Sequence, residues 1–213
     1  MDFNNTDPKI NEIINTGYGI GMIQVYDEIY RTMEFLSSKN ISTFLEIGTN
    51  KGGSFACWIL ICKPELGISI DLPNGVFGTN DFNEQERNEL LSQFDCETHF
   101  ISQNSQDPLN LIDVERILNG RKIDFLFIDG DHTEEGVTRD FFLYKHLVAD
   151  GGWIGFHDIK KTEFHHSVNC FVDFFWDKLE GDKVEFTNYQ HQTCGIGIIQ
   201  KNEKLKFKGY KIA

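Results

Sequence analysis

A length of 213 residues with 40% hydrophobic and 13% aromatic side chains is enough to bury one sizeable core, so a single domain is expected. The formal net charge of −13 disfavours nucleic acid and anionic membranes as partners and favours a small molecule. No apolar run approaches the roughly 20 residues of a membrane span, and the polar, acidic start is unlike a signal peptide, which predicts a soluble, cytoplasmic protein.

Residues 1–20 are polar with little periodicity, and we expect them to form a loop or N-terminal arm before a domain that spans residues 21–213. From Ile23 onward, apolar side chains recur at helical spacing and predict a helix over about residues 22–39. Gln24 faces away from much of this apolar stripe and could reach a ligand, although a solvated side chain is the commoner role of such a glutamine.

The central feature is a strand, a glycine-containing loop and a helix predicted between Thr43 and Cys62. In an open α/β sheet such a junction binds ligands, because it lies at the carboxyl ends of the strands and beside a helix N-terminus. The spacing of Gly48 and Gly52 differs from the dinucleotide fingerprint G-x-G-x-x-G, and the lysine of a phosphate-binding P-loop is missing. Glu46 would repel a pyrophosphate and suits a cationic or hydroxyl-bearing ligand; the alternative is a tight turn with glycines for packing alone.

A second strand is predicted over residues 67–71 and ends in Asp71, 25 positions after Glu46. Nucleotide-binding α/β units place near that position an acid that hydrogen-bonds ribose hydroxyls. Asp71 could instead only cap the turn at Pro73-Asn74-Gly75, but two acids at consecutive strand ends favour the ribose role. Residues 72–81 are expected to form a loop over the same edge of the sheet.

A helix over residues 84–94, a strand over residues 98–101 and a helix that ends at Leu118 are predicted next. Ser105 precedes the second of these helices, and its hydroxyl could contact the edge of an adenine or cap the helix. Asp107 is the better candidate for the cap, because a proline follows it at the position where a helix begins.

The apolar run Ile123–Ile128 predicts a central strand that is buried on both faces. Asp129 and His132 follow it within four residues, and a helix over residues 133–147 comes next. With Asp131 between them, the end of this strand delivers two carboxylates and an imidazole within four residues.

The next predicted strand, over residues 153–156, ends in His157 and Asp158. In a right-handed βαβ unit the ends of neighbouring strands meet, so these two residues and the Asp129–His132 segment are expected to converge at one mouth. Titratable groups that converge in this way are typical of a functional site. The alternative is that each of them only caps a turn.

One amphipathic, aromatic-rich helix is predicted over residues 164–179. His165 and His166 lie at its start, where they line a substrate pocket or are solvated. Residues 184–187 and 195–199 are expected to form a closing antiparallel pair, and the basic C-terminal tail an edge strand or arm.

The cysteines are scattered along the chain and form no C-x-x-C pair. They are Cys57, Cys62, Cys96, Cys170 and Cys194. This spacing is typical of reduced, buried thiols and not of a disulfide framework or a zinc site.

With these segments in view, the chain resembles class I S-adenosylmethionine-dependent methyltransferases of the branch that contains the cephalosporin-hydroxylase-like and macrolide sugar O-methyltransferase proteins (methyltransferase domain 24 type). The resemblance spans roughly residues 20–200, and the combination of segments is more specific than any single motif. The matching segments are Leu45-Glu46-Ile47-Gly48-Thr49, Gly52-Gly53-Ser54, Ile128-Asp129-Gly130-Asp131-His132, Glu135-Gly136-Val137 with Asp140, Phe156-His157-Asp158 and Phe174-Phe175-Trp176-Asp177-Lys178-Leu179.

The resemblance implies a Rossmann-like, doubly wound α/β fold, with a seven-stranded, mostly parallel sheet, an antiparallel last strand and helices on both faces. It also implies that Glu46 and Gly48 hold the methionine end of S-adenosylmethionine, that Asp71 binds the ribose and that Ser105 lies near the adenine. The implied cofactor site is completed by Thr49, Gly52, Ser54 and Asp129.

In metal-dependent relatives, the residues that match Asp129 and the His157-Asp158 pair are acids that bind Mg²⁺, and the histidine that matches His132 is the general base. Here the pair begins with a histidine, and imidazole suits a softer ion such as Mn²⁺, Fe²⁺ or Zn²⁺ better than Mg²⁺. The resemblance therefore implies a divalent metal, Mg²⁺ or Mn²⁺, at Asp129, His157 and Asp158. It implies His132 and Asp129 as the catalytic residues.

These observations together predict methyl transfer from S-adenosylmethionine to a hydroxyl group of a small molecule, with a metal and a histidine base activating that hydroxyl. A sugar, a small phenol or a natural-product scaffold fits as the acceptor. Two alternatives stay open: an NAD-dependent oxidoreductase, against which the missing G-x-G-x-x-G counts, and a non-catalytic protein that binds the cofactor. The N-terminal arm and the aromatic helix could serve a homo-oligomer.

Overall fold

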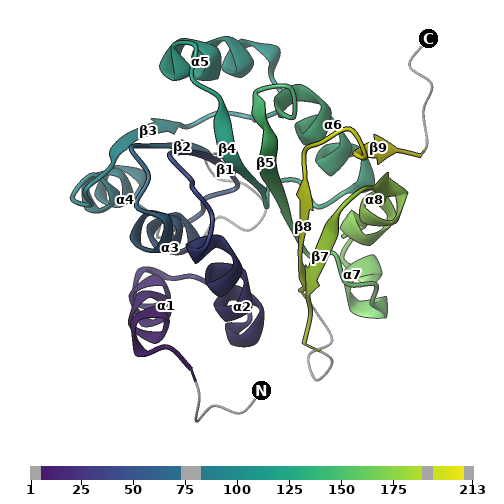
Figure 1. The fold of residues 1–213 in the computed structure, drawn as a ribbon, viewed down its shortest axis with the longest axis horizontal. Helices are drawn as coiled ribbons and strands as arrows, with labels where there is room; N and C mark the ends of the chain where they lie inside the picture. The colour runs from purple at the N-terminus through teal and green to yellow at the C-terminus, as the bar shows by residue number, and fades with distance from the viewer. Residues whose placement is uncertain (1–5, 73–82, 189–193, 209–213) are drawn as a thin grey trace.

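The centre of the molecule is a seven-stranded sheet, seen in a computed structural model that describes residues 6–72, 83–188 and 194–208 (Figure 1). Its strands are β1 (Thr43–Ile47), β2 (Leu66–Ile70), β3 (Glu97–Ile101), β4 (Ile123–Ile128), β5 (Val148–His157), β7 (Lys183–Phe186) and β8 (Ile196–Gln200). Their order across the sheet is β3-β2-β1-β4-β5-β8-β7. β3, β2, β1, β4 and β5 are parallel, whereas β8 is antiparallel to both β5 and β7. The expected sheet, with its closing antiparallel pair, is confirmed.

Helices cover both faces of this sheet (Figure 1). They are α1 (Pro8–Ile20), α2 (Tyr26–Ser37), α3 (Gly53–Cys62), α4 (Glu84–Leu91), α5 (Pro108–Leu118), α6 (Glu134–Tyr144), α7 (Glu163–Ser167) and α8 (Val172–Lys178). α1, α2 and α3 pack on the face that holds Phe44 and Phe127, and α5, α6 and α8 on the face that holds Leu45 and Ile128. β1 and β2 are buried along their whole length, as parallel strands covered on both faces should be.

Two helices begin where their local sequence predicts. Asp107 caps α5 by accepting a hydrogen bond from the Leu109 backbone N–H at 2.9 Å, and Pro108 is the first helical residue. Thr133 caps α6 by accepting from the Gly136 backbone N–H at 3.0 Å. The cap on α6 fixes the short turn between the end of β4 and that helix.

The loop expected over residues 1–20 is wrong for its described part, because α1 occupies residues 8–20. Its buried residues recur at helical spacing: Ile10, Ile13, Ile14 and Gly17. Gly17 permits close packing on α3, since a Cβ there would lie 2.5 Å from the sulfur of Cys57. Polar residues between the isoleucines hid the helical spacing, and α1 is part of the core.

The single helix expected over residues 164–179 is also wrong, because the segment forms α7 and α8 with a turn between them. Asn169 in this turn has a φ of +61°, which a right-handed helix does not allow. The turn lets the Phe171 backbone N–H donate to the His132 carbonyl oxygen at 2.8 Å. The break therefore brings this segment against the end of β4.

The chain beyond α6 differs from expectation at one more place. β5 begins at Val148 instead of residue 153, because the Gly151 and Gly152 backbones pair with Lys201 through bonds of 2.7 and 2.8 Å. The basic tail supplies β9 (Lys206–Phe207), which pairs antiparallel with β6 (Leu179–Glu180). The loop expected over residues 72–81 lies, from residue 73 on, outside the described residues.

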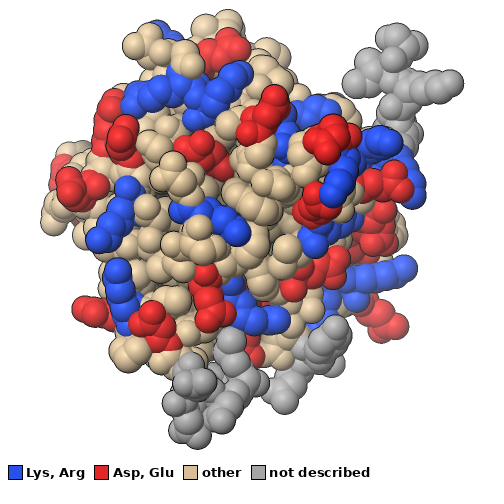
Figure 2. Space-filling view, in the orientation of Figure 1, with Lys and Arg blue, Asp and Glu red and all other residues tan. Residues whose placement is uncertain are grey.

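Acidic and basic side chains are interspersed on the face shown in Figure 2, so the described part of that face carries no continuous basic surface. Each helix within residues 6–72, 83–188 and 194–208 is too short or too polar to cross a bilayer.

Candidate active site

The glycine loop after β1 lies directly against the end of β4. Gly48 has a φ of +85°, and a Cβ there would lie 2.0 Å from the carbonyl oxygen of Asp129. Only glycine allows both this conformation and this contact. The Gly48 N–H donates to Ile70 O and the Asp129 N–H to Ile47 O, each at 2.8 Å. Gly52, at a φ of +92°, is the N-cap residue of α3. The structure thus brings the ends of β1, β2 and β4 into one place.

Glu46, near the end of β1, is fully buried. Its Oε1 accepts a hydrogen bond from Trp58 Nε1 at 2.9 Å, and its Oε2 has no partner among the described residues. Burial raises the pKa of Glu46 to about 8, against the opposing effect of hydrogen bonds with Ser54 and Trp58. Thr49 is buried as well, but its Oγ1 accepts from Ser69 Oγ at 2.6 Å. Glu46 and Ser54 therefore lie together, while the Thr49 hydroxyl links the ends of β1 and β2.

Asp71 lies directly after β2, and its carboxylate is held on both oxygens. Oδ1 accepts from the Asn50 backbone N–H at 3.1 Å, and Oδ2 forms a 3.0 Å ion pair with Arg87 Nη1. Arg87 also donates to the Asn50 carbonyl oxygen at 3.0 Å and is almost completely buried. Asp71 is thus tied to the loop after β1. Arg87 was missed by the sequence analysis, because an arginine in a charged helix carries no signal of its own.

Ser105 does not cap α5; its hydroxyl donates to Asp140 Oδ1 at 2.7 Å. The Tyr144 hydroxyl donates to the Ser105 carbonyl oxygen at 2.7 Å, so α6 holds the Ser105 segment at two points. Burial raises the pKa of Asp140 to about 7, against the opposing hydrogen bond from Ser105. In the sequence, Asp140 stands out only as part of a matching segment, and nothing there predicts its contact with Ser105.

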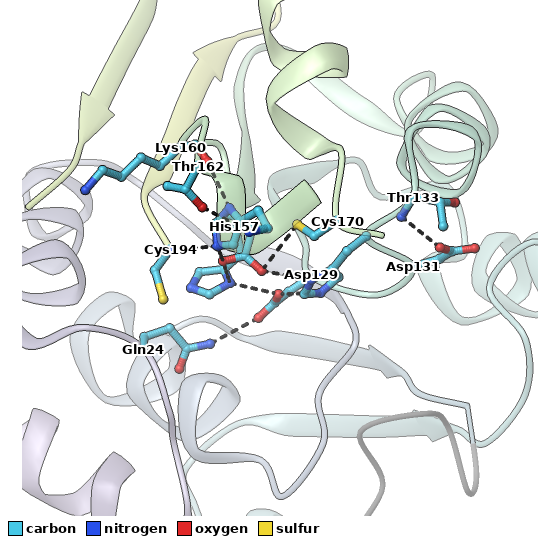
Figure 3. Close-up of polar contacts among 12 residues, drawn as sticks. Gln24, Asp129, Asp131, Thr133, His157, Lys160, Thr162, Cys170 and Cys194 are labelled. Atoms are coloured by element: carbon cyan, nitrogen blue, oxygen red, sulfur yellow. Dashed lines mark hydrogen bonds and ion pairs between the residues drawn. The ribbon is translucent and has the colours of Figure 1, made fainter. Parts of the chain in front are cut away.

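Asp129, His132, His157 and Asp158 meet at the ends of β4 and β5, as expected. Asp129 and His157 of this group are labelled in Figure 3. His132 lies between the two carboxylates, with Nδ1 2.8 Å from Asp158 Oδ2 and Nε2 3.3 Å from Asp129 Oδ1. His157 also lies between them, with Nδ1 3.1 Å from Asp129 Oδ1 and 3.4 Å from Asp158 Oδ1. We call these four alternating acids and imidazoles the acid–imidazole ring.

Burial disfavours every charge in the acid–imidazole ring, but the attraction between opposite charges outweighs it. Against the effect of burial, hydrogen bonds to Asp129 and Asp158 raise the pKa of His132 to about 12. The same two carboxylates raise the pKa of His157 well above its ordinary value. In return, His157 and then His132 lower the pKa of Asp129 and hold that of Asp158 well below its usual range. Without a cation in the site, these shifts favour protonated imidazoles and ionised carboxylates at neutral pH.

Within the acid–imidazole ring, His157 is the residue whose hydrogen-bonding atoms are least satisfied. It is only 6% exposed, and neither ring nitrogen makes a well-directed hydrogen bond within the described part of the chain. Its short distances to Asp129 and Asp158 are ion-pair distances without hydrogen-bond direction. Asp158 has a φ of +60°, which costs energy in a non-glycine residue and is typical of functional sites. A buried imidazole of this kind between two carboxylates is suited to ligating a divalent cation.

Gln24 belongs to this site, so the expectation of a solvated side chain is wrong. It is 5% exposed, and its Nε2 donates to Asp129 Oδ2 at 3.1 Å (Figure 3). Its Oε1 is buried and finds no partner in the residues that the structure describes. Gln24 lies between α1 and α2, 105 positions before Asp129. The only sequence signal was a polar side chain beside an apolar stripe.

Two cysteines and a further histidine surround Asp158 and were not expected there. The thiol of Cys170 donates to Asp158 Oδ2 at 3.9 Å, and His165 Nε2 lies 3.5 Å from Asp158 Oδ1. The backbone N–H of Cys194 donates to His165 Nε2 at 3.0 Å. In the view of Figure 3, Cys170 and Cys194 lie on opposite sides of His157. The five cysteines are free thiols; Cys57 and Cys170 are buried as expected, whereas Cys62, Cys96 and Cys194 are only partly buried.

The two neighbouring histidines of α7 have different surroundings. His165 is buried and reaches the acid–imidazole ring through Asp158. His166 instead pairs with Asp173, with its Nε2 3.0 Å from Oδ2, and its ring lies against Phe171. Only His165 of the two therefore contacts the ring within the described residues.

Comparison with known proteins gives a family match over residues 45–159, to a model described as a methyltransferase domain. A curated relative, the uncharacterized protein R132 of Acanthamoeba polyphaga mimivirus, is 34% identical over 157 residues. This match covers 74% of the present chain and 68% of the relative.

Two solved structures are similar in fold. One is MycE, a methyltransferase from the mycinamycin biosynthetic pathway in complex with Mg, SAH and mycinamycin VI, with a TM-score of 0.59 at 14% identity. The other is an O-methyltransferase from Bacillus cereus in complex with SAH, with a TM-score of 0.51 at 14% identity; this match covers 94% of both chains. The MycE match covers 97% of the present chain, which spans only 58% of MycE.

Proposed function

The chain belongs to the family of the methyltransferase domain that matches residues 45–159, and we propose that it transfers a methyl group from S-adenosylmethionine to a hydroxyl group of a small molecule of sugar or natural-product type. The observation that carries this proposal is the acid–imidazole ring in contact with the Gly48 loop. O-methyl transfer needs a positioned sulfonium donor and a base beside the acceptor hydroxyl, and the loop and the ring suit these two tasks. MycE, whose structure contains SAH and mycinamycin VI, supports the proposal.

The donor would lie along the ends of β1 and β2. Glu46 Oε2 is a buried oxygen that lacks a partner among the described residues, and it suits the ammonium group at the methionine end of the donor. Gly48 allows a ligand to approach bare backbone. Asp71, oriented by Arg87, presents a carboxylate for the ribose hydroxyls. The other proposed cofactor contacts are Thr49, Gly52, Ser54, Ser105 and Asp129.

His132 is the proposed general base, and Asp129 and Asp158 fix the orientation of its ring. In the neutral form, the hydrogen on Nδ1 is donated to Asp158 Oδ2 at 2.8 Å, so Nε2 is the nitrogen that takes the proton of the acceptor hydroxyl. The carboxylates hold the pKa of His132 at about 12, so the neutral form requires that part of their charge be offset.

A divalent cation fits the acid–imidazole ring, because two carboxylates and the unsatisfied, buried imidazole of His157 converge there. The residues proposed to hold it are Asp129, His157 and Asp158. When bound, such a cation supplies positive charge that offsets the carboxylates and acidifies a nearby hydroxyl. Gln24 then orients Asp129 through its bond to Oδ2.

The test of this function measures cofactor binding and methyl transfer on the same preparations. In calorimetry the wild-type protein should bind SAH, and with S-adenosylmethionine it should methylate at least one member of a panel of hydroxylated sugars, phenols and natural products. The variant His132→Ala should lose at least about 100-fold in transfer and keep SAH binding.

The matched control is His146→Ala, because His146 lies on the surface in a pair with Glu115 at 3.7 Å. This variant should keep both SAH binding and methyl transfer. A wild-type protein that does not bind SAH would overturn the proposed function. Full transfer by His132→Ala would remove that residue from the mechanism.

A further inference from the structure

The geometry points to a thiophilic cation site in which Cys194 joins His157 and Asp158, so that the chain selects Zn²⁺ over Mg²⁺. This inference rests on the proposed function for the use of the metal in methyl transfer, whereas the binding itself is a property of the three side chains. A thiolate and an imidazole are ligands of Zn²⁺, while Mg²⁺ demands an octahedral set of oxygens.

The three donors are already close enough to share one ion. One ligand atom each of His157, Asp158 and Cys194 lies within 4.8 Å of the others. In a tetrahedral zinc site, bonds of about 2.0 to 2.3 Å put neighbouring ligand atoms roughly 3.5 Å apart. The three side chains therefore need only small rotations to close around an ion, with a fourth position left for Asp129 or for a substrate oxygen.

His157 supplies a second, independent observation. Both of its ring nitrogens are buried, and among the described residues neither makes a well-directed hydrogen bond. Leaving a buried polar atom unsatisfied is costly, so such atoms in a folded protein commonly have a function. When a cation displaces the proton of His157 to solvent and binds that nitrogen, the cost is removed, and the adjacent carboxylate of Asp158 compensates the charge.

The position of Cys194 is fixed by backbone contacts. Its N–H donates to His165 Nε2 at 3.0 Å, and the Nδ1–H of His165 donates to the Lys160 carbonyl oxygen at 2.9 Å. The next backbone N–H, of Gly195, donates to Glu28 Oε2 at 2.8 Å. These bonds fix the backbone of Cys194 beside the acid–imidazole ring. The location of the thiol therefore follows from the backbone and not from one side-chain rotamer alone.

A second set of possible ligands, His132, Asp158 and Cys170, also has one ligand atom each within 4.8 Å of the others. These three side chains already contact one another. His132 Nδ1 lies 2.8 Å from Asp158 Oδ2, the oxygen to which the Cys170 thiol also donates. His157 faces the other oxygen, Oδ1. Cys170 is therefore a matched control: a thiol against the same carboxylate, on the oxygen that the proposed ion does not use.

The experiment measures metal binding directly. Protein freed of metal by a chelator is titrated with Zn²⁺, Mg²⁺ and Mn²⁺ in calorimetry, and with Co²⁺ as a spectroscopic substitute for Zn²⁺. We expect one equivalent of Zn²⁺ to bind far more tightly than Mg²⁺, and the Co²⁺ protein to show a thiolate-to-metal charge-transfer band. Loss of a residue that only supports a metal ligand costs roughly 10- to 100-fold in affinity, so Cys194→Ser should cost at least about 100-fold and lose the band. Cys170→Ser should keep the band and lose less than about tenfold in affinity, because a serine hydroxyl can still donate to Asp158 Oδ2.

Circular dichroism confirms that each variant is folded, and Cys194→Ala serves as a second variant. Equal affinity for Mg²⁺ and Zn²⁺, or a charge-transfer band that survives in Cys194→Ser, would overturn the inference. SAH binding is measured on the same samples, so the two proposals can fail separately. Methyl transfer with Mg²⁺ and without thiolate ligation would overturn the thiophilic site alone. Zinc binding through Cys194 in a protein that does not bind SAH would overturn the proposed function alone.

Discussion

Replacement of Glu46 by glutamine tests the physical state of the buried acid at the centre of the proposed cofactor site. The side chain is fully buried, its Oε1 accepts a hydrogen bond from Trp58, and burial raises its pKa from an ordinary 4.5 to about 8. Glutamine has nearly the same shape, keeps an oxygen for the Trp58 bond and cannot ionise. Glu46→Gln therefore removes the titration with little change in packing.

The sign and size of the effect follow from the pKa. A folded-state pKa above the unfolded value means that Glu46 binds its proton more tightly in the folded protein. Its contribution to stability is fully present below about pH 4.5 and is lost as the pH rises through about 8. The loss approaches about 1.4 kcal/mol per pH unit over that interval, with an upper limit of about 5 kcal/mol above pH 8. Glu46→Gln should not suffer this loss.

The assay is urea unfolding of the wild type and the variant from about pH 5 to about pH 9. We expect the free energy of unfolding of Glu46→Gln, relative to wild type, to grow by several kcal/mol across this range. Other groups titrate in both proteins, so their contributions cancel in the difference. The matched control is Glu185→Gln, because Glu185 accepts a 2.7 Å bond from Trp176 Nε1 but lies exposed. It should follow the wild type at every pH.

A stability difference between Glu46→Gln and wild type that stays constant with pH would refute the reasoning, because the carboxylate would then be ionised throughout. A saturating concentration of SAH gives a second readout. If the ligand's ammonium group pairs with Glu46, SAH should stabilise wild type more than Glu46→Gln at pH 8, by about 1 kcal/mol or more.

Two further substitutions test how the strand ends are held together. Gly48→Ala places a Cβ 2.0 Å from the Asp129 carbonyl oxygen at a φ of +85°, so it should lower the free energy of unfolding by more than about 4 kcal/mol in urea denaturation. Arg87→Met removes the buried partner of Asp71, so it should weaken SAH binding by about tenfold in calorimetry, about 1.4 kcal/mol, and lower the melting temperature as well.

Each of these substitutions has a control in the chain. Gly120 has the same φ of +85° as Gly48, but a Cβ at Gly120 would meet nothing within 4 Å among the described residues, so Gly120→Ala should cost only about 1–2 kcal/mol. If Gly48→Ala and Gly120→Ala lower the free energy of unfolding by the same amount, the close contact of Gly48 with Asp129 is not the reason that glycine is required there. Arg116→Met breaks an exposed pair and should leave SAH binding unchanged. Unchanged SAH affinity in Arg87→Met would mean that Asp71 does not need its partner to bind the ligand.

The main features of the fold and half of the site could be predicted because they depend on local patterns. Apolar runs that end in Glu46, Asp71 or Asp129 mark buried parallel strands, and right-handed crossovers place the carboxyl ends of such strands together. The meeting of Asp129 with His157 follows from that topology alone. The missed helix α1 and the split of α7 from α8 depend instead on contacts with α3 and with the end of β4.

The sequence by itself determined which strands form and which acids and imidazoles stand at their ends, because those features repeat with the short periods of strands and helices. Tertiary structure alone decided that Gln24 and Cys194 reach the same cluster, since no periodicity relates residues so far apart in the chain. It also decided the protonation of Glu46 and His132. A pKa depends on burial and on neighbouring charges, and both exist only once the chain has folded.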